Sequence, residues 1–113
     1  MKRLRIGNDI SVTWNVKKNG TAVELFGKFV RLYMTHAKGR EEIEKYTVSG
    51  STVSFTIEGL KQKVLGRYTL TIDIRTGSND GARFMIQDKC GAFELVGRSC
   101  VEEPEETDYT IIL

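Results

Sequence analysis

Few side chains of this protein could carry out chemistry. The single histidine, His36, could serve as a general base, a common role of histidine in catalysis. It lies in a polar stretch typical of a turn, and no cysteine or second histidine stands at metal-ligand spacing from it. We therefore expect His36 to be a surface side chain rather than a catalytic or metal-binding one.

The two cysteines, Cys90 and Cys100, have a spacing that fits neither a redox pair nor a zinc site. If residues 92–97 are extended, they span roughly 20 Å at about 3.3 Å per residue. A disulfide needs Cα atoms within about 7 Å of each other. The sequence thus predicts two free thiols, unless the chain reverses sharply at Gly91 or Gly97.

Several carboxylates could in principle form a catalytic pair. Asp73 and Asp88 fall on separate expected strands, and Glu41, Glu42 and Glu44 share a polar turn. A catalytic pair needs a fixed separation across a cleft, and nothing in the pattern fixes one. We interpret these residues as solvated charges.

The sequence also contains no established cofactor or metal motif. GxGxxG, P-loop and GxSxG patterns are absent. The segment TGSNDGA offers Asn79 and Asp80 as calcium ligands but lacks the further acidic ligands of a dedicated site. We predict no catalytic, cofactor-binding or metal residues, and we expect a protein that is not an enzyme.

The elements that would position any site are clearest in GRYTLTIDIR, residues 66–75. Tyr68, Leu70, Ile72 and Ile74 alternate with polar residues, which is the period of a strand with one face in solvent. A glycine shortly before Tyr68 is typical of the tyrosine corner of immunoglobulin-like sandwiches, where the hydroxyl bonds to backbone. An ordinary core aromatic explains Tyr68 equally well.

Similar alternation recurs along the chain between glycine-containing turns. Asn19-Gly20 predicts a hairpin, and residues 58–66 have the apolar spacing of a single helical turn. Seven or eight strands at spacings of about 8 to 12 residues predict an all-β fold, an immunoglobulin-like antiparallel β-sandwich. The predicted core takes the inward residues of each run: Ile10, Val12, Trp14, Val30, Leu32, Val53, Phe55, Tyr68, Leu70, Ile72, Phe93 and Leu95.

The distribution of charge divides the chain in two. The formal charge of the 113 residues is +2, but residues 101–113 hold five acidic residues and no basic ones, so the first hundred carry 17 − 10 = +7. The basic residues are scattered singly, which argues against a nucleic-acid partner. We expect a β-sandwich domain in residues 1–101, then an acidic linker and a C-terminal apolar strand or tail in residues 102–113.

The hydropathy pattern predicts no membrane partner. No segment approaches the ~20 apolar residues of a spanning helix, and the basic first ten residues are not followed by the apolar stretch of a signal peptide. As given, the chain is expected to be cytosolic.

Three stretches, taken in order, resemble a small domain at the N-terminus of phage and prophage tail or baseplate structural proteins, of the baseplate upper protein type. They are RLRIGNDISVTWNVKKNGTAVELFG, then VSGSTVSFTIEG followed by GRYTLTI, then DKCGAFELVGRSC, and they cover most of residues 3–100. The resemblance implies a non-enzymatic adaptor that attaches a fibre to the tail. Its partners would be other tail or baseplate proteins or copies of itself, in the virion tail or, from a prophage, in the bacterial cytoplasm.

The two ends of the chain are the candidate interface. KRLRI is basic and alternating, whereas the last residues are acidic and then apolar, so their charges could draw the ends together. We expect an apolar strip with basic flanks, made of Lys2, Arg3, Leu4, Arg5, Ile6, Tyr109, Ile111 and Leu113. The strip could be buried in the monomer, which would make the tail a structural strand, or exposed toward a neighbouring subunit or a following shaft. Pro104 and the neighbouring glutamates are typical of a linker, which favours exposure.

The alternative function is a surface module that binds carbohydrate or a protein ligand. Sugar sites need an exposed aromatic ring beside polar groups. Trp14 falls on the inward phase of its run. An exposed Trp14 would favour this alternative.

Overall fold

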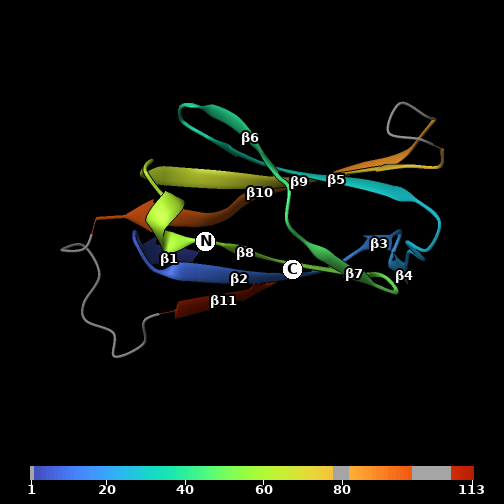
Figure 1. The fold of residues 1–113 in the computed structure, drawn as a ribbon, viewed down its shortest axis with the longest axis horizontal. Coiled ribbons are helices and arrows are strands. Elements are labelled where there is room, and N and C mark those ends of the chain that lie inside the picture. The colour runs from blue at the N-terminus through green and yellow to red at the C-terminus, as the bar shows by residue number, and fades with distance from the viewer. Residues whose placement is uncertain (1, 78–81, 98–107) are drawn as a thin grey trace.

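The fold is a β-sandwich of two mixed sheets (Figure 1). The computed structural model describes residues 2–77, 82–97 and 108–113. One sheet has five strands in the order β1-β10-β9-β5-β6, and the other has four in the order β11-β2-β8-β7. The all-β prediction is confirmed, but the expected purely antiparallel arrangement is not, because β1 runs parallel to β10 and β11 runs parallel to β2.

The five-stranded sheet contains β1 (Lys2–Arg5), β5 (Phe29–His36), β6 (Gly39–Ile43), β9 (Gly66–Arg75) and β10 (Arg83–Val96). The four-stranded sheet contains β2 (Asp9–Asn15), β7 (Thr47–Ser49), β8 (Thr52–Ile57) and β11 (Asp108–Ile112). The remaining elements are a small hairpin of β3 (Lys17–Lys18) and β4 (Thr21–Ala22), and a 3-10 turn, η1 (Gly59–Lys61). The described residues thus place nine strands in the two main sheets, against the seven or eight expected.

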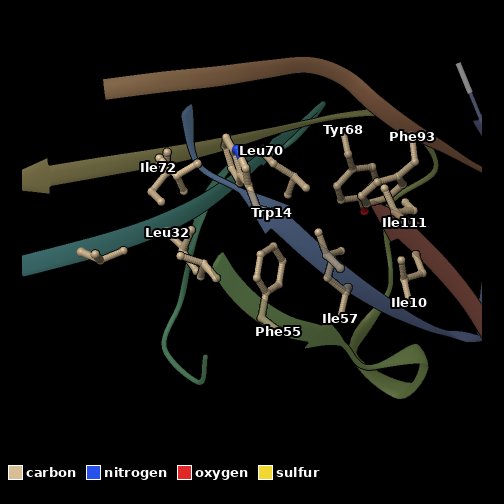
Figure 2. Close-up of a cluster of buried hydrophobic side chains, with 14 of the residues drawn as sticks. Ile10, Trp14, Leu32, Phe55, Ile57, Tyr68, Leu70, Ile72, Phe93 and Ile111 are labelled. Carbon is tan, nitrogen blue, oxygen red and sulfur yellow. The ribbon is translucent and has the colours of Figure 1, made fainter. Parts of the chain in front are cut away.

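The core between the sheets contains every residue that the alternation predicts for it. All twelve predicted core residues are buried, and Trp14, Leu32 and Phe93 are fully so. Figure 2 shows side chains of both sheets meeting, with Trp14 and Phe55 from the four-stranded sheet and Leu70 and Ile72 from the five-stranded sheet. Strict two-residue alternation fixes which face of a strand is inward, so these twelve positions follow from the sequence alone. The core also contains residues outside that prediction, among them Leu4 and Ile111.

Two local predictions are also confirmed. Asn19 and Gly20 both have positive φ, 53° and 81°, as the two-residue turn between β3 and β4 requires. The short helical segment is the single turn η1, and it packs closely on the turn before β2. A Cβ on Gly59 would lie 2.2 Å from the carbonyl oxygen of Gly7, so only glycine fits there.

Strand β9 does not have the solvent face that its pattern predicts. Thr71 and Asp73, on its outer face, are 7% and 8% exposed. Strand β9 is the central strand of five, and longer side chains flank these two: Tyr33 lies opposite Thr71 on β5, and Ile86 lies opposite Asp73 on β10. A short polar side chain between longer neighbours is shielded from water even on an outer face.

The two lateral sides of the sandwich are built differently. On the closed side, defined here by the edge strands β1 and β11, the two ends of the chain meet. On the open side, defined by the edge strands β6 and β7, each edge strand covers only part of its neighbour. Strand β6 pairs with residues 32–36 of β5, and β7 pairs with residues 52–54 of β8. Residues 44–46 cross from one sheet to the other between them (Figure 1).

Candidate functional site

The predicted terminal strip does come together, but inside the monomer. Leu4 and Ile111 are 1% and 6% exposed and belong to the core. Lys2 Nζ donates to the carbonyl oxygen of Thr110 at 3.0 Å, and the Arg5 N–H donates to the Tyr109 hydroxyl at 3.3 Å. Ile6, Tyr109 and Leu113 pack against the core from its margin, while Arg3 lies outside and pairs with Glu94.

The predicted exposure of this strip is therefore wrong. The cause is pairing of the last residues with β2 of the four-stranded sheet. The Leu113 N–H donates to the Thr13 carbonyl at 2.8 Å, and the Asn15 N–H donates to the Leu113 carbonyl at 2.9 Å. Residues 108–113 are a structural edge of the sandwich rather than a separate tail. Residues 98–107, which contain the expected domain boundary and Pro104, lie outside the described residues.

His36 is not the surface side chain that its turn-like context predicts. It ends β5 on the inward phase, and its side chain is only 6% exposed. The Lys38 N–H donates to Nδ1 at 3.1 Å, so Nε2 carries the proton that bonds to the Glu41 carboxylate at 2.5 Å. His36 thus fixes the β5–β6 turn, and Glu41 lies on strand β6 rather than in the expected polar turn.

Tyr68 satisfies both interpretations of its pattern. Its ring is buried and stacks on Phe93 with centroids 4.8 Å apart, as a core aromatic would. Its hydroxyl donates to the carbonyl of Val64, four residues upstream, at 2.7 Å. Burial first, and then the charge of Glu41, raise the pKa of Tyr68 above its usual value.

The two aspartates form structural contacts rather than a catalytic pair. Asp73 accepts ion-pair contacts from Arg75 at 3.5 Å and Arg83 at 3.9 Å, and Asp88 accepts a hydrogen bond from the Thr71 hydroxyl at 2.5 Å. The prediction that Asp73 is solvated is wrong, because its central strand buries it. Within residues 2–77, 82–97 and 108–113, no group of three or more His, Cys, Asp or Glu is placed to hold a metal ion.

Five further positions considered in the sequence have simple outcomes. Cys90 is exposed and free, whereas Cys100, Asn79 and Asp80 lie outside the described residues. Trp14 is 0% exposed, so it offers no platform for a sugar. Its placement in the core is confirmed.

The feature that the sequence did not single out is an apolar groove on the open side. It lies where β5 runs beyond the reach of β6, and its volume is about 450 Å³. We call it the aromatic groove and define it by six lining residues: Leu25, Phe26, Phe29, Val30, Tyr46 and Val48.

The aromatic groove exposes three large apolar side chains. Phe26 is 89% exposed, Phe29 46% and Val48 42%. The Tyr46 hydroxyl donates to the carbonyl of Val30 at 2.5 Å, at a position of β5 that β6 does not reach. Burial raises the pKa of Tyr46, with a further increase from Glu42. Clustered exposed apolar side chains of this kind mark interaction sites on soluble proteins.

The surroundings of the aromatic groove are basic. The ammonium groups of Lys18 and Lys28 each lie 4.9 Å from the centroid of the Phe84 ring. Glu24, which lines the groove, turns one carboxylate oxygen back to accept the Phe26 N–H at 3.0 Å. Among the described residues, no carboxylate is within ion-pair distance of Lys18 or Lys28, so two unpaired ammonium groups lie near the groove against the single carboxylate of Glu24.

Sequence reasoning had a signal for this groove in ELFGKF, residues 24–29, which places two phenylalanines around a turn glycine. Gly27 has a φ of 78°, as such a turn requires. Whether the two rings are covered depends on how far β6 extends along β5, which no local pattern encodes.

Comparisons with protein-family models, with curated proteins and with solved structures found no match for this chain. Within the described residues, no helix has the length and apolar character needed to cross a membrane.

Proposed function

We propose that this protein is a non-enzymatic adaptor domain of a phage or prophage tail fibre or baseplate, which acts through protein–protein assembly. The observation that carries the proposal is the aromatic groove, with Phe26 89% exposed beside Phe29 and Val48. A grouped apolar surface of this kind is stabilised by contact with another protein. The partners are other tail or baseplate proteins, and the location is the virion tail or, from a prophage, the bacterial cytoplasm.

We infer further that the sandwich is immunoglobulin-like. The Tyr68 hydroxyl reaches a backbone carbonyl four residues upstream, as the tyrosine corner of those folds does. The chain also changes sheets between β1 and β2 and again between β6 and β7, so that both sheets are built from interleaved segments. These features, together with the ordered resemblance of residues 3–100, support the assignment.

The experiment that tests the adaptor function looks for the protein in assembled particles. Purified phage or induced prophage particles from the source organism should contain this chain by mass spectrometry, and an antibody against it should label tails by electron microscopy. Labelling of heads only, or absence from particles that contain their other tail proteins, would contradict the proposal.

A pair of variants then connects assembly to the groove. Phe26→Ser should reduce incorporation into particles, because it removes the most exposed aromatic of the groove. Leu60→Ser is the matched control, since Leu60 is 96% exposed on η1, outside the aromatic groove. Equal incorporation of both variants would show that the aromatic groove is not needed for assembly into particles.

The alternative of a carbohydrate-binding module has less support. An exposed Trp14 would have favoured it, and Trp14 is fully buried. Binding of a protein ligand remains compatible with the same groove.

A further inference from the structure

We infer that strand β7 accepts an extended strand from a partner protein, which adds to the four-stranded sheet and places an apolar side chain in the aromatic groove. The partner strand carries acidic residues beside its apolar ones. The inference rests on the proposed adaptor function and names how its partner is bound.

The backbone of β7 is oriented for such pairing. Gly50 and Ser51 form a two-residue turn, so the flanking pair Ser49 and Thr52 exchanges both backbone hydrogen bonds. Bonded and non-bonded pairs alternate along an antiparallel ladder. The Val48–Val53 pair is therefore non-bonded, and the N–H and C=O of Val48 point away from β8.

An independent contact confirms this phase. The Val16 N–H donates to the Ser51 carbonyl at 2.8 Å, which directs Ser51, and by alternation Val53, toward β2. The backbone N–H and C=O groups of Thr52 and Ser54 therefore bond to β7. The N–H and C=O groups of Val48 point to the free edge of β7. In the part of the chain that the structure describes, β7 has a strand neighbour on one side only.

The position of β7 explains why its edge is suited to a partner. Most exposed edge strands of native proteins are protected by charges, prolines or bulges. Strand β7 reads Thr-Val-Ser and has none of these, and all three residues are exposed. An added strand would lie over the aromatic groove, where Val48 and Phe29 could bury its inward side chain.

The chemistry of the partner follows from charge. Lys18 and Lys28 approach the same Phe84 ring, and neither is neutralised by a described carboxylate. Lys28 also lines the groove and donates to the Glu24 carbonyl, which holds its ammonium group at the rim. An incoming strand with acidic residues would form ion pairs with these ammonium groups, whereas a basic strand would be repelled by them.

The binding experiment uses the full 113-residue chain, ¹⁵N-labelled, and two synthetic probes of about eight residues. One probe alternates glutamate with valine and the other alternates lysine with valine. The Glu/Val peptide should shift the Val48 amide and slow its hydrogen exchange, and the Lys/Val peptide should bind at least about tenfold more weakly. Equal binding of the two peptides would overturn the charge assignment.

The decisive variant is Val48→Pro. Proline removes the one N–H that faces the free edge and leaves the β7–β8 hydrogen bonds intact, so the fold should persist while the Glu/Val peptide binds at least about tenfold more weakly. The matched control is Glu42→Pro on β6. By the same alternation from the turn at residues 37–38, the Glu42 N–H also faces a free edge. Glu42→Pro should bind the peptide normally.

Each remaining outcome decides the matter. Unchanged peptide binding by Val48→Pro, or equal loss in both proline variants, would overturn strand addition at β7. Concentration-dependent dimers abolished by Val48→Pro would replace the acidic partner by a second copy of this chain. If Phe26→Ser abolishes incorporation into particles while Val48→Pro does not, the adaptor function stands and strand addition fails.

Discussion

The closed and open sides of this sandwich each consist of two edge strands, but among the described residues the edge strands bond across to each other's chain ends only on the closed side. On the closed side β1 and β11 run parallel to their neighbours, and the backbone and side chains of the two ends bond to each other across the gap between the sheets. On the open side β6 does not reach residues 29–31 of β5, and β7 does not reach residues 55–57 of β8. Partial pairing occurs on both sides, since β1 pairs only with residues 93–96 of β10. The closed side is structural because the two ends of the chain bond to each other across it.

The largest expected effect contrasts two neighbouring isoleucines on the closed side. Ile111→Ala should cost about 2–5 kcal/mol, because Ile111 is 6% exposed and its loss leaves a cavity. Ile112→Ala should change stability by less than about 0.5 kcal/mol, since Ile112 is 73% exposed. Chemical denaturation measures both. Equal effects would mean that β11 is not a structural edge, and the contrast between the sides would be lost.

The next effect concerns the turn that supports the start of the closed side. Gly59→Ala should cost about 1–3 kcal/mol, because the new Cβ would overlap the Gly7 carbonyl and force η1 away from β2. Gly97→Ala is the control, since nothing lies within 4 Å of its Cβ position. A thermal melt compares the two, and an undisturbed Gly59→Ala protein would show that the η1 contact is not tight.

The open side should respond very little by the same measurement. Phe26→Ser should change the free energy of unfolding by less than about 0.5 kcal/mol, because its ring is already in solvent. This result would sharpen the comparison by showing that the groove contributes to binding without contributing to stability. A loss comparable to that of Ile111→Ala would mean that Phe26 is packed in solution.

The smallest effect is a pH dependence of the open side through Tyr46. Burial raises its pKa in the folded protein above the unfolded value of about 10. Its contribution is then complete below that value and is lost as the pH rises through the folded pKa, because the unfolded chain releases the proton first. Tyr46→Phe should therefore show a shallower fall in unfolding free energy at alkaline pH, and an unaltered slope would contradict the burial of this hydroxyl.

Local pattern predicted much of this fold. Alternation identified Trp14, Phe55 and ten further core residues, and Asn19-Gly20 identified its hairpin, because each depends on residues a few positions apart. The burial of Asp73 could not be read in this way, since it depends on β9 being central among five strands. Strand β6 was likewise predicted to be a polar turn. An edge strand can lack an apolar face, so β6 shows no apolar alternation in the sequence.

The candidate site was predicted least well. The sequence correctly predicted that the two ends of the chain lie together. The same charges and apolar spacing, however, fit pairing within one monomer and pairing between two chains equally well. The aromatic groove depends on where β6 stops along β5 and on where residues 44–46 cross, and both are properties of pairing between distant strands. Phe26 and Phe29 are visible in the sequence, while the absence of a cover over them is not.

The parallel pairing of β11 also bears on how the chain reaches its final structure. Asn15 and Leu113 bond although they are 98 residues apart, so this seam closes a very long loop and forms late in folding. During synthesis the edge of β2 that pairs with β11 stays uncovered until the last residues have been made, whereas β7 and β8 can already be paired. The partner-binding edge would thus exist before the protective one, and premature contact between nascent chains is most to be expected along β2.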